Sequence, residues 1–145
     1  MGFDAGKKVK GTKRQVLTDS LGLMLAVAVH PANVRDRDGA AQVVSKRTRR
    51  RFPFIEVIHA DAGYQGPRVA AIAERSGNWR VEIVRRLETD KGFVVQPKRW
   101  IVERTLAWIS RNRRLAKDFE CLARKSLAFI RLAMIKIMLR RLVRT

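Results

Sequence analysis

The sequence predicts an α/β protein with a partly antiparallel sheet. Three observations predict this class: short apolar runs bounded by turn residues, helical patterns between those runs, and a continuous helical pattern from Arg99 onward. Of the 145 residues, 46% are hydrophobic, which is enough apolar material for the core of one domain. We therefore expect a single folded unit in which helices pack on a sheet.

The N-terminal part is predicted to contain a loop followed by a β-hairpin. Residues 2–14 are rich in Gly and Lys without an apolar period, which predicts a flexible basic loop. Apolar runs over 15–18 and 23–29 flank a turn-like cluster at 19–22, so these runs are expected to pair as a hairpin. Pro31 should end the second strand, because proline has no N–H to donate.

The middle of the chain is predicted to alternate helices and strands. A helix is expected over 36–47, because acidic residues stand in its first turn and basic ones in its last. The basic run 46–51 is expected to break this pattern before Pro53. The elements expected next are a strand over 55–60, a helix over 67–75, a strand over 79–86 and a short strand at 94–95.

Two helices are predicted after the sheet, over about 99–117 and 120–143. Projection of the first at about 100° per residue turns an apolar face centred on Trp108 inward and places Glu103 on the opposite side. The second helix is apolar with basic residues interspersed. It is expected to pack on the sheet or on a second subunit, and a helix bound to a membrane surface is the alternative.

The net charge of +19 and the sequence pI of about 11.6 indicate a polyanionic partner. The excess lies at the two ends: residues 53–98 carry seven basic and six acidic side chains, whereas residues 99–145 carry thirteen and three. Nucleic acid is the expected partner. An anionic membrane or ribosomal RNA would explain the total charge equally well, and a solvated charged surface is the structural alternative.

Cysteine usage and hydropathy indicate a cytoplasmic protein without a membrane partner. Cys121 is the single cysteine, so no internal disulfide is expected, and no Cys or His pattern has zinc spacing. Residues 1–20 lack a signal-peptide pattern. The longest uncharged run, 20–34, contains a proline and is shorter than the roughly 20 apolar residues that a spanning helix needs.

Several other residues that attract attention are expected to be structural. His30 and His59 lie on or near predicted strands and receive no catalytic role. Cys121 is expected to be an inert small hydrophobe. The three tryptophans are expected in the core, with base stacking by Trp100 as the alternative; they are Trp79, Trp100 and Trp108.

Two carboxylates in this basic chain are candidate functional residues. Asp61 ends an apolar run and precedes Gly63 and Gly66, and ligands of α/β sheets gather at the carboxyl ends of strands. Asp61 could equally cap a turn or helix. Glu103 has arginines around it, so it is either a metal ligand or the partner of Arg99 in an i,i+4 pair.

The stretch RWIVERTLAWISRNRRLAKDFE resembles the C-terminal signature of bacterial insertion-sequence transposases of the DDE class. In that group the third acidic residue follows an arginine and three intervening residues, as Glu103 follows Arg99. HADAGYQG resembles the segment that carries the second Asp of the family, here Asp61. GKKVKGTKRQVLTDSLGLMLAVAVHPANVRDRDGA resembles the preceding hairpin and helix, so the resemblance covers nearly all of residues 2–143.

The resemblance implies an RNase H-like fold that cuts and joins DNA by metal-dependent phosphoryl transfer. Asp61 and Glu103 are the implied catalytic residues and metal ligands, which in the family hold two Mg²⁺ (or Mn²⁺) ions roughly 4 Å apart. The implied DNA contacts are Arg99, Arg104, Arg111, Arg114 and Lys117. The implied partners are transposon-end and target DNA, in a bacterial cytoplasm.

The chain departs from the family pattern at three places. The first Asp of the triad is expected on an opening strand upstream of GFDAGKK, and neither Asp4 nor Asp19 is expected to replace it. Gln96 stands where the family has a tyrosine, and Ser110 where it has a basic residue. Without the opening strand, two sheet edges should be exposed beside an apolar groove.

We therefore expect residues 1–145 to form one N-terminally truncated catalytic domain. Its expected parts are a basic loop (1–14), a core of sheet and helices (15–98) and C-terminal helices (99–145). The expected activity is DNA binding with incomplete catalysis, and the alternative is a non-catalytic nucleic-acid-binding module with structural carboxylates. A homo-oligomer and the product of an upstream reading frame are candidate protein partners.

Overall fold

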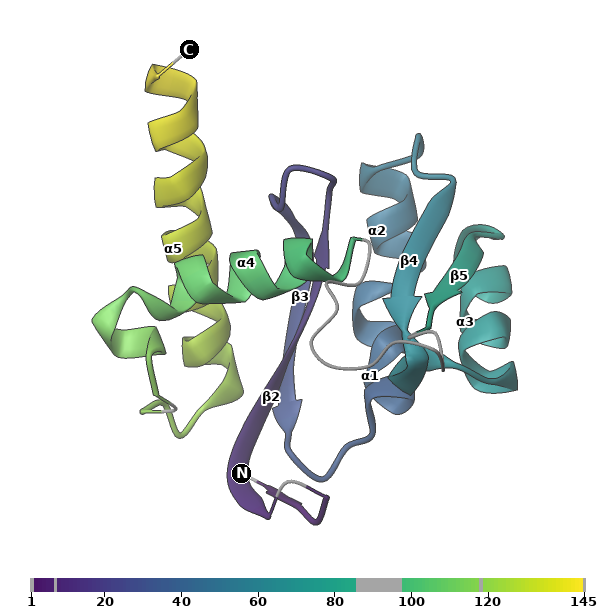
Figure 1. Cartoon of the computed structure of the whole chain (residues 1–145), viewed down its shortest axis with the longest axis horizontal. Helices are drawn as coiled ribbons and strands as arrows, with labels where there is room; N and C mark the ends of the chain where they lie inside the picture. Colours follow the sequence, from purple (N-terminus) through teal and green to yellow (C-terminus); the bar gives the residue numbers. More distant parts are fainter. Residues whose placement is uncertain (1, 7, 86–97, 118, 145) are drawn as a thin grey trace, which may run out of the picture.

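The computed structural model describes residues 2–6, 8–85, 98–117 and 119–144. Within these ranges the chain forms a three-stranded antiparallel sheet, in the order β1-β2-β3, and a two-stranded parallel sheet of β4 and β5, with helices packed on them (Figure 1). The predicted mixed α/β class is confirmed.

The antiparallel sheet consists of β1 (Gly2–Asp4), β2 (Val9–Thr18) and β3 (Met24–Pro31). The hairpin is confirmed, but the predicted loop over 2–14 is wrong: β1 pairs with β2 from Gly2↔Gly11 to Asp4↔Val9. Backbone hydrogen bonding does not need an apolar period, so exposed lysines can occupy a strand whose ladder is satisfied.

One predicted helix is in fact two, α1 (Asp36–Val43) and α2 (Lys46–Arg51). Ser45 separates them and caps α2, because its Oγ accepts a hydrogen bond from the backbone N–H of Thr48 at 3.3 Å. The basic run that was expected to break the helical pattern therefore forms a helix of its own. Thr48 is buried and Arg49 packs on the Trp79 ring, whereas the other cations of α2 are exposed.

The parallel sheet is a β-α-β unit that ends at Asp61. It comprises β4 (Val57–Asp61), a 3-10 turn η1 (Ala62–Tyr64), α3 (Pro67–Gly77) and β5 (Arg80–Val84). β4 and β5 pair from Val57↔Arg80 to Asp61↔Val84. The two predicted strands and the helix between them are confirmed with small shifts of their ends, whereas the strand predicted at 94–95 lies outside the described residues.

Three elements follow: α4 (Arg99–Ser110), a 3-10 turn η2 (Arg113–Leu115) and α5 (Ala123–Val143). The predicted helix over 99–117 is thus too long. Asn112 contributes to ending α4, because its side-chain Nδ2 donates to the carbonyl oxygen of Ile109 at 3.0 Å. α5 packs on β3 and on the end of α4, as expected for a helix that covers the sheet.

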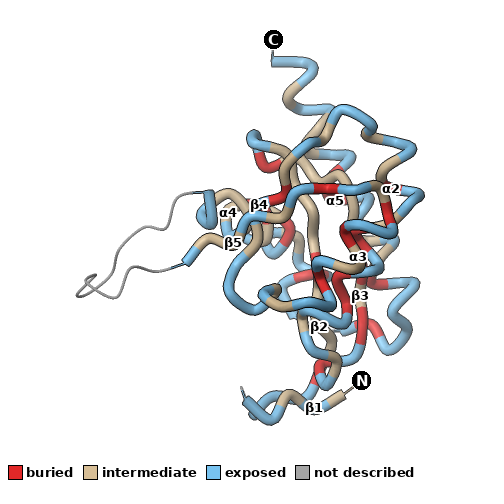
Figure 2. Tube along the Cα trace, turned by 90° about the vertical axis from the view of Figure 1, so that its right-hand side faces the viewer, coloured by how far each residue is buried: buried red, intermediate tan, exposed pale blue. Residues whose placement is uncertain are grey.

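β3 is buried on both faces because its side chains alternate between two cores. Ala26 and Ala28 face a cluster formed with α1, α3 and β4, whereas Val27 and Val29 face a cluster under α4 and α5. Figure 2 shows buried residues on β3 and α3, and exposed or half-buried residues over β1. β3 therefore contacts both hydrophobic clusters and holds them in a fixed relative position.

The tryptophans differ in burial. Trp79 is 5% exposed, as predicted, and Trp108 is half-buried. Trp100 is 44% exposed, so its expected core position is wrong: it lies in the first turn of α4, on the outer side of the helix. Cys121, which was expected to be an inert small hydrophobe, is a free and exposed cysteine. Among the described residues, no helix is long and apolar enough to cross a bilayer.

Candidate functional site

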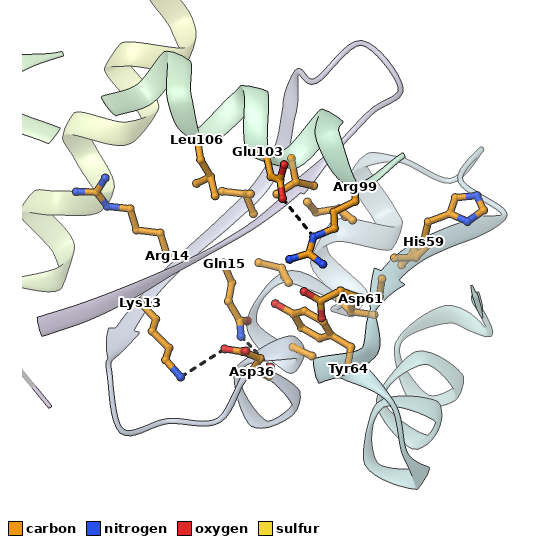
Figure 3. Close-up of a pocket in the computed structure, with 18 of the residues that line it drawn as sticks. Lys13, Arg14, Gln15, Asp36, His59, Asp61, Tyr64, Arg99, Glu103 and Leu106 are labelled. Carbon is orange, nitrogen blue, oxygen red and sulfur yellow. Dashed lines mark hydrogen bonds and ion pairs between the residues drawn. The ribbon is translucent and has the colours of Figure 1, made fainter. Parts of the chain in front are cut away.

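A cavity of about 720 Å³ lies between the two sheets (Figure 3). One wall is the edge of β2 at residues 12–17, the other is the edge of β4 at residues 58–61, and α4 covers part of the opening. In the described part of the chain, β2 pairs with β3 on its far side at these positions, and β4 pairs only with β5. Two strand edges therefore face one space without a strand between them.

The structure brings Asp61 and Glu103 to this cavity from different elements. Asp61 ends β4, and its Oδ1 accepts a hydrogen bond from the backbone N–H of Gly63 at 2.9 Å. Glu103 lies on α4, and its Oε1 stands 3.2 Å from Nε of Arg99. Figure 3 shows the Arg99 guanidinium between the two carboxylates. Both carboxylates therefore have the local partners that the sequence suggested, while remaining at the cavity surface.

Asp36 is a third carboxylate of the cavity that sequence reasoning missed. A Cβ built at Gly63 would lie 3.0 Å from Asp61 Oδ1 and 3.4 Å from Asp36 Oδ2, so the two carboxylates flank this glycine. Asp36 stands at the first position of α1, where it was interpreted only as complementing the helix dipole. Its Oδ1 lies 3.6 Å from the Lys13 ammonium. Only the packing of α1 against η1 places Asp36 beside Asp61.

Tyr64 reports the electrostatics of this corner. Burial raises the pKa of its hydroxyl above the ordinary value of 10.0, and the negative charges of Asp36 and Asp61 raise this pKa further. Each of these causes opposes formation of a tyrosinate. Burial together with the Asp36 and Asp61 carboxylates therefore disfavours a negative charge on the Tyr64 hydroxyl.

Tyr64 is expected to ionise well above pH 10 when absorbance at 295 nm is followed in an alkaline titration. It is the single tyrosine of the chain, so the signal belongs to one residue. Because the pKa of Tyr64 is raised in the folded state, the contribution of its neutral hydroxyl to the free energy of unfolding is fully present below pH 10.0. This contribution is lost as the pH rises through the pKa that Tyr64 has in the folded state. Asp36→Asn and Asp61→Asn should each lower the midpoint. If Tyr64 of the folded chain ionised at its ordinary pKa of 10.0, its buried position beside Asp36 and Asp61 would be refuted.

The described residues do not by themselves fit a metal centre. Asp36, Asp61 and Glu103 offer the hard oxygen donors that Mg²⁺ takes, yet no three His, Cys, Asp or Glu residues among those the structure describes are grouped closely enough to hold an ion. In addition, the Arg99 guanidinium pairs with Glu103. No reaction step is therefore assigned to a metal held by these residues alone.

His59 on β4 also lines the cavity and links that strand to the start of α4. Nζ of Lys98 lies 2.7 Å from its Nε2, and Oε2 of Glu82 lies 3.4 Å from its Nδ1. The ammonium must be the donor to Nε2, so Nδ1 carries the ring proton toward Glu82. This chain of contacts supports the structural role predicted for His59. His30 is also structural, because it is 3% exposed between the hairpin and α1.

The five predicted DNA contacts divide into two groups. Arg104 stacks between Trp100 and Trp108, with its guanidinium carbon 4.5 and 4.8 Å from the ring centroids. Arg114 binds the buried Glu120 at 2.5 Å, and Arg99 pairs with Glu103 as described above. Arg111 and Lys117 are exposed, directly after α4 and after η2 respectively.

A second groove, of about 380 Å³, lies between the end of α4 and the outer part of α5. Five cations line it and no carboxylate does; they are Arg111, Lys136, Arg140, Arg141 and Arg144. Arg141 stacks on Trp108 with its guanidinium carbon 4.8 Å from the ring centroid, which holds this part of the groove in place. Arg111 was selected from the sequence, whereas the three cations of α5 and Arg144 after it were missed because they are far from Arg111 along the chain.

The chain belongs to the transposase DDE domain family, whose model matches residues 2–138. Over 128 residues it is 34% identical to a protein of Burkholderia cepacia described as a transposase for insertion sequence element IS402. This match covers 84% of the chain and 60% of the relative, so the chain spans less than two thirds of that relative's length. No solved structure matches the chain. The family predicted from the quoted motifs is confirmed.

Proposed function

We propose that the chain is a DNA-binding part of an insertion-sequence transposase, in which Asp61 and Glu103 are two of the active-site carboxylates. The observation that carries this proposal is the single cavity that receives both side chains, from β4 and from α4. Family membership supports the reaction class, because DDE-type chemistry requires carboxylates that converge on one point. Residues 1–145 would form one incomplete domain of RNase H-like architecture.

The slot between β2 and β4 supports an incomplete catalytic sheet. β1 already occupies the same edge of β2, because Gly2 pairs with Gly11 antiparallel. A segment that extended β1 backward in this register would run along residues 12–17 of β2, with β4 on its other side. Such a strand would be hydrogen-bonded at about 4.8 Å spacing to both neighbours and would join the two sheets into one. We propose that it carries the missing carboxylate toward Asp61 and Glu103.

A direct test is to supply this segment, fused in front of Gly2, with one Asp placed on the slot. Mg²⁺-dependent nicking of a supercoiled plasmid is expected for the fusion and not for the chain alone. An Asp→Asn version of the added segment should give the same stability without nicking, which separates sheet completion from chemistry. Nicking by the unextended chain, lost in Glu103→Gln, would overturn the proposed requirement.

DNA binding is proposed for the basic groove between α4 and α5, together with Lys117. Its five cations without a carboxylate form a concentrated positive surface, and one face of it is the Trp108 ring. Phosphate neutralisation releases counterions, so log affinity for duplex DNA should fall with log salt by about 0.9 per phosphate bound. Transposon ends and target DNA are the proposed ligands in the family context.

Arg111→Ala and Lys136→Ala should each weaken duplex binding and reduce the salt slope by about 0.9. Both side chains are exposed, so the variants should fold as the parent does. Arg75→Ala is the matched control, because this exposed cation belongs to α3, on the opposite side of the molecule from α5 (Figure 1). Fluorescence anisotropy at several salt concentrations measures the effect. A salt slope that none of the groove variants changes would contradict the assignment.

A non-catalytic nucleic-acid-binding module is the second candidate. It is favoured by the local partners of the carboxylates, since Asp61 accepts a hydrogen bond from Gly63 and Glu103 pairs with Arg99. The two candidates differ in metal binding. Asp61→Ala and Glu103→Ala should weaken Mg²⁺ binding by the strand-completed protein under the transposase proposal, whereas the module proposal predicts no change in Mg²⁺ binding.

A further inference from the structure

α5 carries a second apolar face that is exposed in the described part of the chain. Its exposed members follow one another at spacings of three, four and three residues: Leu132 (61% exposed), Ile135 (50%), Leu139 (56%) and Leu142 (73%). We call these four residues the α5 stripe. The spacing is that of the a and d positions of a heptad, which place side chains in one narrow seam along a helix.

The stripe is distinct from the face by which α5 packs into the protein. The buried residues of α5 include Ile130, Ala133 and Met134, which join the core beneath β3 and α4. At 100° per residue these positions lie on the side of the helix opposite the stripe. α5 is therefore apolar on two opposite faces, and only one of them is used within the described chain.

The flanks of the stripe are basic. With Leu132 and Leu139 at a positions, Arg131 takes the g position and Lys136 the following e position, and both are exposed. In a parallel pair of two α5 helices, g and the next e of the partner face each other, so Arg131 would oppose Lys136 twice. No Asp or Glu occurs in Ala123–Val143 to relieve this repulsion. The charges disfavour a second copy as the occupant.

We infer that the α5 stripe docks an amphipathic helix with acidic flanks, supplied by a partner protein segment. Leucine-like side chains of that helix would fill the seam between Leu132 and Leu142, and its Glu or Asp residues would pair with Arg131 and Lys136. The apolar contact provides the affinity, while the charge pairs select the partner and its register. The four stripe residues lie outside the lining of the DNA-binding groove, and Lys136 is the one residue that the groove shares with the flanks of the stripe.

An anionic membrane is a weaker match for this surface. A helix that lies in a bilayer interface inserts a broad apolar face, and the broad apolar face of α5 is already packed against the protein. The remaining seam is narrow and has a cation on each side. Such a seam fits between the side chains of another helix and leaves little surface to insert among lipid chains.

The probe for the test is a fluorescent synthetic helix with Leu at a and d positions and Glu at e and g positions. Its own acidic flanks keep it from pairing with itself. Anisotropy in about 150 mM salt should show binding to the full chain. Two control peptides, one of the same composition with scrambled spacing and one with Lys flanks, should bind at least about tenfold more weakly.

Variants of the chain locate the contact. Ile135→Ser with Leu139→Ser changes two exposed side chains, so folding should be retained, and binding of the acidic helix should fall by at least about tenfold. Arg131→Glu with Lys136→Glu should reverse the preference toward the Lys-flanked helix. Arg50→Glu with Arg75→Glu makes the same change of net charge at exposed positions on α2 and α3, and should leave the preference unchanged.

Three outcomes would overturn the inference. Equal binding of the scrambled and regular acidic helices would show attraction by net charge alone. Wild-type self-association in analytical ultracentrifugation, abolished by Ile135→Ser with Leu139→Ser, would show that a second copy covers the stripe. Flotation with phosphatidylcholine–phosphatidylserine vesicles that depends on the same pair of residues, without binding of the acidic helix, would show a lipid surface instead.

Discussion

Ile109→Ala is expected to lower the free energy of unfolding by about 2–5 kcal/mol. Ile109 is 0% exposed and packs with Leu115, Ile130 and Met134, where α4, η2 and α5 meet the face of β3. Truncation removes the transfer free energy of its side chain and leaves a cavity that these neighbours close only in part. Urea denaturation followed by tryptophan fluorescence measures the loss.

Leu132→Ala is the matched control for this prediction. It also shortens a branched aliphatic side chain, but Leu132 is 61% exposed, so the free energy of unfolding should change by less than about 0.5 kcal/mol. Equal losses for the two variants would mean that Ile109 is not in the core. Because α4 carries Glu103, the Ile109 variant should also weaken any activity that depends on the position of α4.

Arg104→Ala is expected to lower the free energy of unfolding by about 1–3 kcal/mol. Its guanidinium stacks between Trp100 and Trp108 and donates to the Leu21 carbonyl oxygen at 2.9 Å, which fastens the tip of the β2–β3 hairpin to α4. Thr105 makes a second hydrogen bond between α4 and the hairpin, because its Oγ1 donates to the Gly22 carbonyl oxygen at 2.7 Å. Loss of the arginine leaves the Trp100 ring without its cation and removes the shorter of two hydrogen bonds to the Leu21 carbonyl oxygen, whereas Arg141 remains stacked on Trp108 and 3.4 Å from that oxygen.

Arg104→Lys should recover only a minor part of this stability, because an ammonium cannot stack flat between two rings. Arg111→Ala is the comparison: it removes the same charge from an exposed position of α4 and should leave the free energy of unfolding unchanged. The order of the two variants should be reversed in the DNA-binding measurement: Arg111→Ala should bind DNA more weakly than Arg104→Ala does. If folded Arg104→Ala binds DNA as weakly as Arg111→Ala does, Arg104 contacts phosphate after all.

The elements that the sequence located correctly are those with a local apolar pattern. The strand before Asp61 and the helix after it each bury one face, and the second strand of the hairpin is a continuous apolar run packed on both faces, so each pattern is visible in the letters. β1 was missed because it is held by ladder hydrogen bonds to β2 rather than by burial. The break between α1 and α2 was missed because a capping serine decided it.

For the candidate site, the sequence supplied Asp61 and Glu103 through motifs, and could not supply their neighbours. Asp36 and Tyr64 have ordinary local explanations as a helix-terminal acid and a turn aromatic. They join Asp61 only because α1 packs on η1. For Arg104, the position on α4 suggested phosphate contact, and the sequence could not show that two tryptophans and the hairpin tip also contact this side chain.

The amino-acid sequence by itself determined the family, the mixed α/β class, the strongly basic character and the two carboxylates, because these are properties of residue identity and of short-range periodicity. The tertiary structure alone decided that Asp61 and Glu103 share a cavity with Asp36, which cations are held by other side chains, and that α5 keeps an apolar stripe uncovered. These features depend on contacts between segments far apart in the sequence, such as the hydrogen bond from Arg14 to the Leu115 carbonyl oxygen, which joins positions 101 residues apart, and no local pattern records such contacts.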